Sequence, residues 1–197
     1  MNPSRAFFDV DTQMDFMLPS GSLYVRGAEE IIPNLQKLMT YAQTHGIPIL
    51  SSADAHPPDD PSFAEWPPHC VVGTPGQQRI PETRLLDACV VANQPGAFKS
   101  LSPWPAQVII EKQEYDALTN VNCNAILDVL GKRRYVVFGV ATDYCVRGTV
   151  LGLLKRGCSV DLVTDAIRAI TEQRGQQAVA EMVSAGARLI TRAEACS

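Results

Sequence analysis

Residues 135–148 read YVVFGVATDYCVRG and join an apolar run to the start of a helical pattern. The run 135–140 is almost wholly apolar, which is typical of a strand buried on both faces of a parallel sheet. After it, side chains recur along one helical face until a glycine stops the pattern: Val146, Thr149, Val150, Leu153, Leu154 and Gly157. A strand that leads directly into a helix is the repeating unit of α/β proteins. This segment therefore predicts an α/β fold.

The same alternation extends along the rest of the chain. Further strands are expected at residues 6–11, 48–54, 106–112, 159–165 and 188–191, and further helices at residues 31–42, 123–130 and 172–184. We therefore expect a three-layer α/β fold in which helices cover both faces of a mostly parallel sheet. The 197 residues suit one domain, residues 1–197. A long irregular loop at about residues 54–106 holds ten of the 14 prolines, and a loop of that length is usually functional.

Composition excludes several classes of partner. The formal net charge is −4 with no basic run, so neither nucleic acid nor an anionic membrane is expected to bind. No apolar stretch approaches the roughly 20 residues of a transmembrane helix. The first residues, MNPSRAFFDVD, do not resemble a signal peptide, and we expect a cytoplasmic protein whose six cysteines stay reduced. These cysteines include no CxxC pair, which argues against a structural zinc knuckle.

Chemically active side chains stand where the predicted strands end. Asp11, Asp54 and Lys112 close three of the strands, and the turn at 141–145 with Cys145 follows a fourth. In an open parallel sheet, ligands bind at the carboxyl ends of the strands. We therefore expect an acid, a second acid, a base and a thiol on one edge of the sheet.

Cys145 would lie in the first turn of a helix that begins near Thr142 or Asp143, both good N-cap residues. The unpaired amides of such a turn favour negative charge, lower the pKa of a cysteine and so produce the nucleophilic thiolate. The amides of Ala141 and Cys145 could then hold the oxyanion of a tetrahedral intermediate. The alternative for Cys145 is a small buried side chain with no chemical role.

A carboxylate at Asp11 can take the proton of the thiol, and a neighbouring Lys112 would keep that carboxylate ionised. Taken singly, Asp11 could also be a solvated acid at a strand end, and Lys112 a surface lysine. The combination of these residues with Cys145 favours catalysis.

The long loop carries a candidate metal site. Asp54 and His56 stand two residues apart at a strand end, and His69 follows in the rigid segment WPPHC. Two imidazoles and a carboxylate are a common ligand set for zinc, and also for iron or manganese. The alternative is a pair of exposed loop histidines.

The segments DTQMDF (11–16), PSGSLYVRGAEEIIPN (19–34) and GVATDYCV (139–146), with a lysine closing a strand between them, resemble the isochorismatase-like cysteine hydrolases, in particular their nicotinamidase branch. The resemblance covers most of the chain. It implies the isochorismatase-like hydrolase fold, a catalytic triad of Asp11, Lys112 and Cys145, and a cis peptide bond between Val140 and Ala141 that aims the oxyanion amides.

The metal loop shares this resemblance. The pattern DxH followed by WPPHCVVGTPG (66–76) is similar to the nicotinamidase metal loop and implies that Asp54, His56 and His69 are the ligands of one divalent ion, zinc first, with iron or manganese as alternatives. Relatives often have a further ligand near position 62, where this chain has Ser62.

The resemblance also implies the substrate. Phe16 and Trp66 resemble the aromatic walls around a pyridine ring, and Tyr115 is our candidate for a third wall. The implied reaction is hydrolysis of nicotinamide to nicotinate and ammonia through an acyl thioester on Cys145. Alternatives are a related amidase for carbamoyl, ureido or maleamate-type substrates, a vinyl-ether hydrolase, a silent binding module, and a redox role for Cys145. The partners we expect are a small amide and further copies of the chain.

Overall fold

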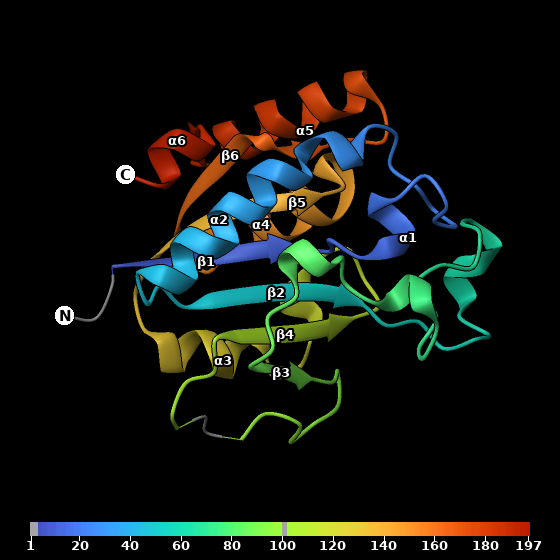
Figure 1. Ribbon diagram of the computed structural model, residues 1–197, viewed down its shortest axis with the longest axis horizontal. Helices are drawn as coiled ribbons and strands as arrows, with labels where there is room; N and C mark the ends of the chain where they lie inside the picture. Colours follow the sequence, from blue (N-terminus) through green and yellow to red (C-terminus); the bar gives the residue numbers. More distant parts are fainter. Residues whose placement is uncertain (1–3, 100–101) are drawn as a thin grey trace.

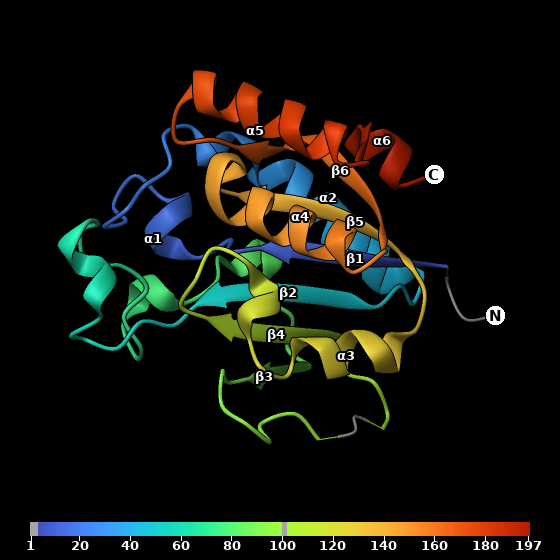
Figure 2. The same cartoon turned by 180° about the vertical axis from the view of Figure 1, so that it is seen from behind.

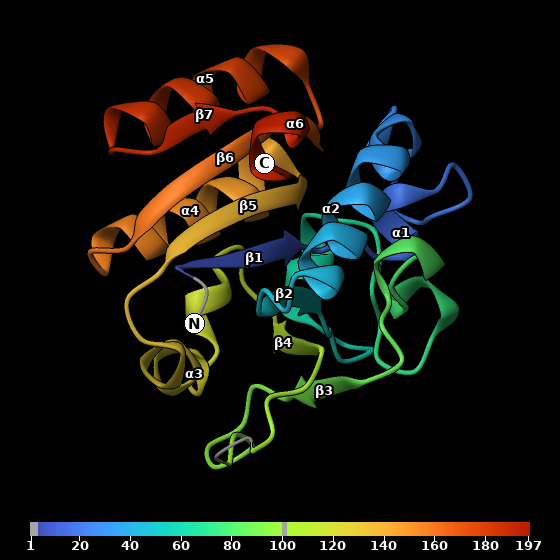
Figure 3. The same ribbon diagram turned by 60° about the vertical axis from the view of Figure 1, so that its left-hand side comes forward.

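A parallel sheet of seven strands forms the centre of the computed structural model, which describes residues 4–99 and 102–197 (Figure 1). The strand order is β3-β4-β2-β1-β5-β6-β7, so β3 and β7 are its two edges (Figure 3). The strands are β1 (Arg5–Val10), β2 (Ile49–Asp54), β3 (Ala88–Val91), β4 (Gln107–Lys112), β5 (Arg134–Val140), β6 (Ser159–Arg168) and β7 (Arg188–Ile190). All six neighbouring pairs are parallel.

Helices cover both faces of this sheet, as Figures 1 and 2 show from opposite sides. The α-helices are α1 (Met14–Met17), α2 (Ile32–Thr44), α3 (Cys123–Leu130), α4 (Arg147–Lys155), α5 (Glu172–Ser184) and α6 (Arg192–Ala195). Successive side chains of a strand point to opposite faces. Phe7 of β1 accordingly belongs to one buried cluster with Leu35 of α2, and Phe8 belongs to the other with Ile126 of α3 and Val150 of α4. The predicted three-layer α/β fold is confirmed.

Two elements depart from the sequence prediction. The predicted irregular loop contains the edge strand β3, which pairs with β4. This strand has only four residues, and Val91 alone is buried, so neither an apolar run nor an alternating pattern marks it. The strand β6 continues to Arg168, beyond the predicted end at 165, because after an irregularity in register Ile167 pairs with Gly139 and Arg168 with Val140.

The sheet brings the expected functional residues to one side. The strands β1, β2 and β4 end at the same edge, where α1 and the loop after β2 project from the body of the molecule (Figure 1). Within the described ranges, no helix has the length and apolar character needed to cross a bilayer.

Candidate active site

Asp11 follows the last residue of β1 and is held by the neighbouring strand. Its backbone has a positive φ of 49°, and its amide donates to the carbonyl of Ser52 at 3.2 Å. The hydroxyl of Ser52 donates to Asp11 Oδ1 at 2.7 Å, and the residue is fully buried. Burial raises the pKa of the Asp11 carboxyl, and the nearby charge of Asp54 adds to this, whereas Lys112 and Ser52 act in the opposite direction.

Lys112, the last residue of β4, lies between two carboxylates and the thiol. Its Nζ is 2.8 Å from Asp11 Oδ2 and 3.5 Å from Cys145 Sγ, and it also contacts Asp54 Oδ1 closely. The side chain is fully buried, so the surface-lysine alternative is wrong. Burial alone would lower the pKa of Lys112, but the charges of Asp11 and Asp54 outweigh burial and hold the pKa well above its ordinary value.

Cys145 lies in a π-helical turn, Thr142–Val146, that leads into α4. The expected N-cap is wrong: the turn begins after Ala141, with no capping hydrogen bond from a side chain in this described segment. The carboxylate of Asp143 accepts instead from the amide of Ile170 at 3.0 Å.

The expected lowering of the Cys145 pKa is also wrong. Only 7% of the residue is exposed, and burial raises its pKa well above the ordinary value. The positive charge of Lys112 acts against this shift, but Asp11 and Asp54 reinforce it. One carboxylate oxygen of Asp11 lies within 4.8 Å of the sulfur. The geometry therefore pairs a neutral thiol with a carboxylate that can accept its proton.

The end of the strand β5 (Arg134–Val140) requires glycine at position 139. Gly139 has φ of 120°, and a Cβ atom there would lie 2.1 Å from the carbonyl oxygen of Val10. Only glycine permits both the conformation and this approach to the end of β1. The peptide bond between Val140 and Ala141, at the end of β5, is cis, as predicted.

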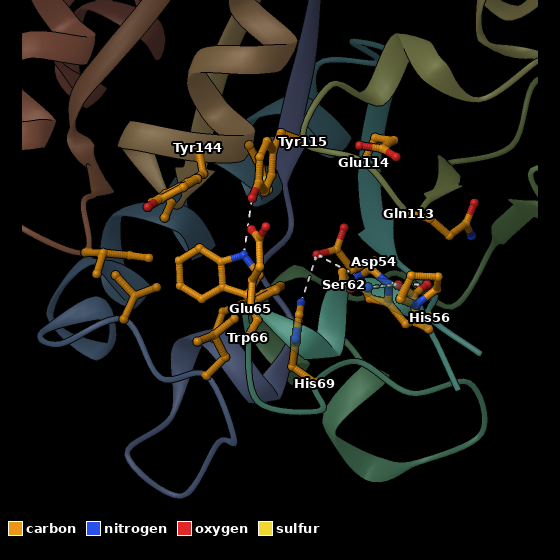
Figure 4. A pocket seen from close by; sticks show the side chains of 18 of the residues that line it. Asp54, His56, Ser62, Glu65, Trp66, His69, Gln113, Glu114, Tyr115 and Tyr144 are labelled. Carbon is orange, nitrogen blue, oxygen red and sulfur yellow. Dashed lines mark hydrogen bonds and ion pairs between the residues drawn. The ribbon is translucent and has the colours of Figure 1, made fainter. Parts of the chain in front are cut away.

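Asp54, His56 and His69 meet beside this group, with their ligand atoms within 4.8 Å of one another (Figure 4). Asp54 Oδ2 is 3.7 Å from His56 Nε2 and 3.9 Å from His69 Nε2. All three residues are at most 5% exposed, so the two histidines are not surface side chains.

Both imidazoles are fixed through their other ring nitrogen. His56 Nδ1 lies 2.9 Å from Asp60 Oδ2, and His69 Nδ1 lies 2.8 Å from the carbonyl oxygen of Pro67. An oxygen at Nδ1 fixes the tautomer that leaves Nε2 free to bind a metal. The buried hydroxyl of Ser62, which has no hydrogen-bond partner among the described residues, lines the same cavity. These residues fit a divalent metal ion.

Charge and burial act differently on the two imidazoles. The carboxylates of Asp54 and Asp60 outweigh the effect of burial and raise the pKa of His56, whereas burial lowers the pKa of His69. The pKa of Asp60 falls to about 2, because hydrogen bonds from Ser62 and His56 outweigh its desolvation. At neutral pH the ionised carboxylate of Asp60 can therefore accept a hydrogen bond from Nδ1 of His56.

A cavity of about 490 Å³ opens above these groups and reaches Cys145. The three expected aromatic residues, Phe16, Trp66 and Tyr115, all line it. The indole Nε1 of Trp66 donates to the hydroxyl of Tyr115 at 3.2 Å, which joins the loop after β2 to the loop after β4 (Figure 4). The ring of Phe16 lies 5.6 Å from that of His69. Of the expected site residues, Asp11 and Lys112 do not line this cavity but lie buried behind it, where Lys112 contacts Cys145 and Asp54.

Tyr144 is a cavity residue that the sequence reasoning missed. Its ring lies 5.3 Å from that of Trp66 and 5.2 Å from that of Tyr115. Arg174 of α5 donates to its hydroxyl at 2.5 Å and lies over its ring at 5.1 Å. An aromatic side chain directly before the candidate nucleophile was the signal available in the sequence.

The chain matches the Isochorismatase domain family over residues 5–194. The nicotinamidase of Escherichia coli is 30% identical over 213 residues, with 98% of this chain and 97% of the relative covered. The nicotinamidase/pyrazinamidase of Mycobacterium tuberculosis is 28% identical over 200 residues, covering 94% and 98%. The crystal structure of the pyrazinamidase of Pyrococcus horikoshii in complex with zinc superposes with a TM-score of 0.79 at 32% identity, covering 96% of this chain and 99% of that one. The chain therefore belongs to the isochorismatase family of hydrolases, in its nicotinamidase branch.

Proposed function

We propose that the protein hydrolyses nicotinamide to nicotinate and ammonia, with Asp11, Lys112 and Cys145 as its catalytic residues. The observation that carries this proposal is the position of Lys112 Nζ, 2.8 Å from Asp11 Oδ2 and 3.5 Å from the sulfur of Cys145, which lines the aromatic cavity. The nicotinamidases and pyrazinamidases among its relatives support the choice of substrate.

Acylation begins from the neutral thiol of Cys145. The sulfur attacks the carboxamide carbon while its proton passes to the Asp11 carboxylate, and the ammonium of Lys112 stabilises the sulfur as negative charge develops on it. The amides of Ala141 and Cys145 hold the oxyanion. Asp11 then returns the proton to the leaving nitrogen, the C–N bond breaks, and ammonia leaves an acyl thioester on Cys145.

Deacylation uses the same residues in the opposite sense. Asp11, again a carboxylate, removes a proton from a water molecule as its oxygen attacks the thioester carbon. The C–S bond breaks, the departing sulfur takes the proton back from Asp11, and the product acid leaves and gives up its remaining proton, which the released ammonia can take, to become nicotinate. One water is consumed for each amide, so the atoms balance.

Asp54, His56 and His69 would hold a divalent metal ion, for which zinc is our first candidate and iron or manganese are alternatives. When bound, the ion would offer an open coordination position to the pyridine nitrogen and so orient the ring. Phe16, Trp66 and Tyr115 would enclose the ring faces. These side chains fix where the carboxamide stands relative to Cys145, which is the contribution of orientation to the rate.

We further propose that residues 1–197 act as one catalytic domain and assemble with copies of themselves in the cytoplasm. The single continuous sheet supports the first statement. Light scattering of the purified protein tests the second: a mass near 21.4 kDa would identify a monomer and contradict the expected assembly.

The decisive experiment is an assay of ammonia release from nicotinamide. Cys145→Ser should lower turnover by at least about 10⁴-fold, because a serine hydroxyl beside Asp11 is a far weaker nucleophile than a thiol. Metal content and the unfolding curve should remain those of the wild-type protein. Treatment with a chelator should also lower turnover, and zinc should restore it.

Cys158→Ser is the matched control, because this cysteine is partly exposed and is absent from the residues that line the cavity. It should retain full turnover. Ammonia release by Cys145→Ser at the wild-type rate would refute the proposed nucleophile. Release from carbamoyl or ureido substrates in place of nicotinamide would refute the proposed substrate.

A further inference from the structure

The side chain of Gln13 pairs with the backbone of Asp54 as a neighbouring strand would. Its Oε1 accepts from the amide of Asp54 at 2.7 Å, and its Nε2 donates to the carbonyl of the same residue at 2.8 Å. The same Nε2 also donates to the carbonyl of Gln77 at 2.8 Å. Both polar atoms of the buried carboxamide are therefore engaged, and two of the three hydrogen bonds end on one residue.

Both carboxylate oxygens of Asp54 have a partner in the site, so the orientation of this side chain matters for two contacts. Oδ1 contacts Lys112, and Oδ2 faces the Nε2 atoms of His56 and His69. A rotation of the Asp54 backbone would move both oxygens together. The Asp54 carboxylate can contact Lys112 with one oxygen and a metal ion with the other only if the backbone of Asp54 is fixed in this position.

The polar atoms of the Gln13 side chain contact the backbone of Asp54 and of Gln77, but none of the proposed ligand atoms. Gln13 is fully buried and is absent from the residues that line the cavity. Its backbone belongs to the turn that follows Asp11, because the amide of Gln13 donates to the carbonyl of Asp11 at 2.7 Å. Gln13 therefore connects the turn that carries the catalytic acid to the strand end that carries the first metal ligand.

We infer that Gln13 is a positioning residue for the metal site, which it serves by fixing the backbone of Asp54. The inference rests on the proposed ligands Asp54, His56 and His69, but not on nicotinamide as the substrate. Loss of partners that orient metal ligands typically weakens metal affinity by about 10–100-fold. The Gln13 side chain should have an effect in this range on zinc binding.

The test measures zinc affinity directly, by competition with a chromophoric chelator and without any substrate. Gln13→Ala removes all three hydrogen bonds and should raise the zinc Kd by at least about 10-fold. Gln13→Glu has nearly the same shape and can still accept from the amide of Asp54, but as a carboxylate it cannot donate to the two carbonyls. Its zinc Kd should also rise, because the carboxylate oxygen that replaces Nε2 would face the carbonyl oxygens of Asp54 and Gln77.

Gln107 provides a matched control. It is another fully buried glutamine whose carboxamide makes three hydrogen bonds, donating to Ser51 Oγ at 2.8 Å and to the carbonyl of Thr83 at 3.0 Å, and accepting from the amide of Leu85 at 3.0 Å. None of these partners is a proposed ligand. Gln107→Ala should therefore destabilise the metal-free protein as much as Gln13→Ala does, while its zinc Kd stays within about twofold of the wild-type value.

Amide hydrogen exchange at Asp54 gives a second readout, which Gln13→Ala should accelerate because it removes the acceptor of that amide, and which the control should leave unchanged. Equal zinc affinity in wild-type protein and Gln13→Ala would overturn the inference, as would an equal loss of affinity in Gln107→Ala. If Gln13→Ala does not fold, the zinc Kd of Gln13→Glu decides in the same way. Wild-type protein that binds no zinc would overturn the inference together with the proposed ligands, whereas absence of ammonia release would bear only on the proposed reaction.

Discussion

At the scale of single residues, the site depends on one buried cation. Lys112 has no exposed surface and contacts a carboxylate on either side, Asp11 and Asp54. Each of these carboxylates would be costly to bury without a positive charge beside it. The same ammonium lies 3.5 Å from the thiol of Cys145. Lys112 thus stabilises the two buried carboxylates, and it also stabilises the negative charge that develops on the sulfur during attack.

Replacing Lys112 by methionine should destabilise the metal-free protein by about 3–5 kcal/mol, because two buried carboxylates lose their counter-charge. Urea unfolding in the presence of a chelator measures this loss. Arg147→Ala is the comparison: Arg147 makes two hydrogen bonds to Glu181, but both side chains are at least 40% exposed, so the cost should stay below about 1 kcal/mol. Similar losses in the two variants would mean that burial does not determine the strength of the Lys112 contacts.

At the scale of elements, the junction of β1 with β5 shapes the site. The backbone of Gly139 in β5 approaches Val10 so closely that even a methyl group has no room. Val10 is the residue before Asp11, and Gly139 precedes the cis peptide bond that leads to Cys145. The catalytic acid and the nucleophile therefore depend on the same contact between two strands.

Gly139→Ala should cost about 3 kcal/mol or more of folding free energy, since it combines a positive φ with a steric clash against backbone. It should also lower turnover, because relief of the clash moves the end of β1 and with it Asp11. Thermal unfolding and the ammonia assay measure the two effects. Gly46→Ala isolates the effect of the positive φ, because Gly46 has φ of 61° and nothing lies within 4 Å of the added methyl group. It should lower the folding free energy by about 1–2 kcal/mol and leave turnover unchanged. A mild effect of Gly139→Ala would contradict the argument.

Sequence reasoning succeeded where a local pattern determines the structure. Nearly unbroken apolar runs mark the central strands, and the carboxyl ends of these runs predict that Asp11, Asp54 and Lys112 lie on one edge of the sheet. It failed where contacts between distant parts of the chain determine the structure. The strand β3 exists only because β4 supplies its partner, and the pKa of Cys145 follows from burial that a turn sequence cannot reveal. Tyr144 becomes a cavity wall only when two distant loops bring their rings against it.

At the scale of the whole molecule, the candidate active site and a cluster of ion pairs around Asp161 lie towards opposite ends of the strands. The candidate site occupies the carboxyl ends. Nearer the amino ends, Asp161 of β6 accepts from Arg134 of β5 at 3.0 Å and from two nitrogens of Arg188 of β7 at 2.9 and 2.8 Å. Asp161 is 2% exposed, so this carboxylate connects three strands from a largely buried position.

Asp161→Asn should therefore lower stability by about 1–3 kcal/mol at pH 7 and leave turnover unchanged. The arginine hydrogen bonds outweigh desolvation and hold the pKa of Asp161 below its ordinary value of 3.8. Since the folded protein releases this proton more readily than the unfolded chain, the stabilisation is complete above pH 3.8 and is lost as the pH falls through the lower folded-state pKa.

The difference in unfolding free energy between wild-type protein and Asp161→Asn should accordingly be constant from pH 7 to about 5 and shrink as the solution becomes more acidic than the ordinary pKa. Asp128→Asn is the control. The Asp128 side chain forms an ion pair with Arg156 but is 74% exposed, so the substitution should change the unfolding free energy little at any pH. An Asp161→Asn effect that stays the same at pH 7 and pH 2 would show that the loss comes from packing and not from the charge. A fall in ammonia release in this variant would show that the amino ends of the strands are coupled to the catalytic edge, contrary to the separation argued here.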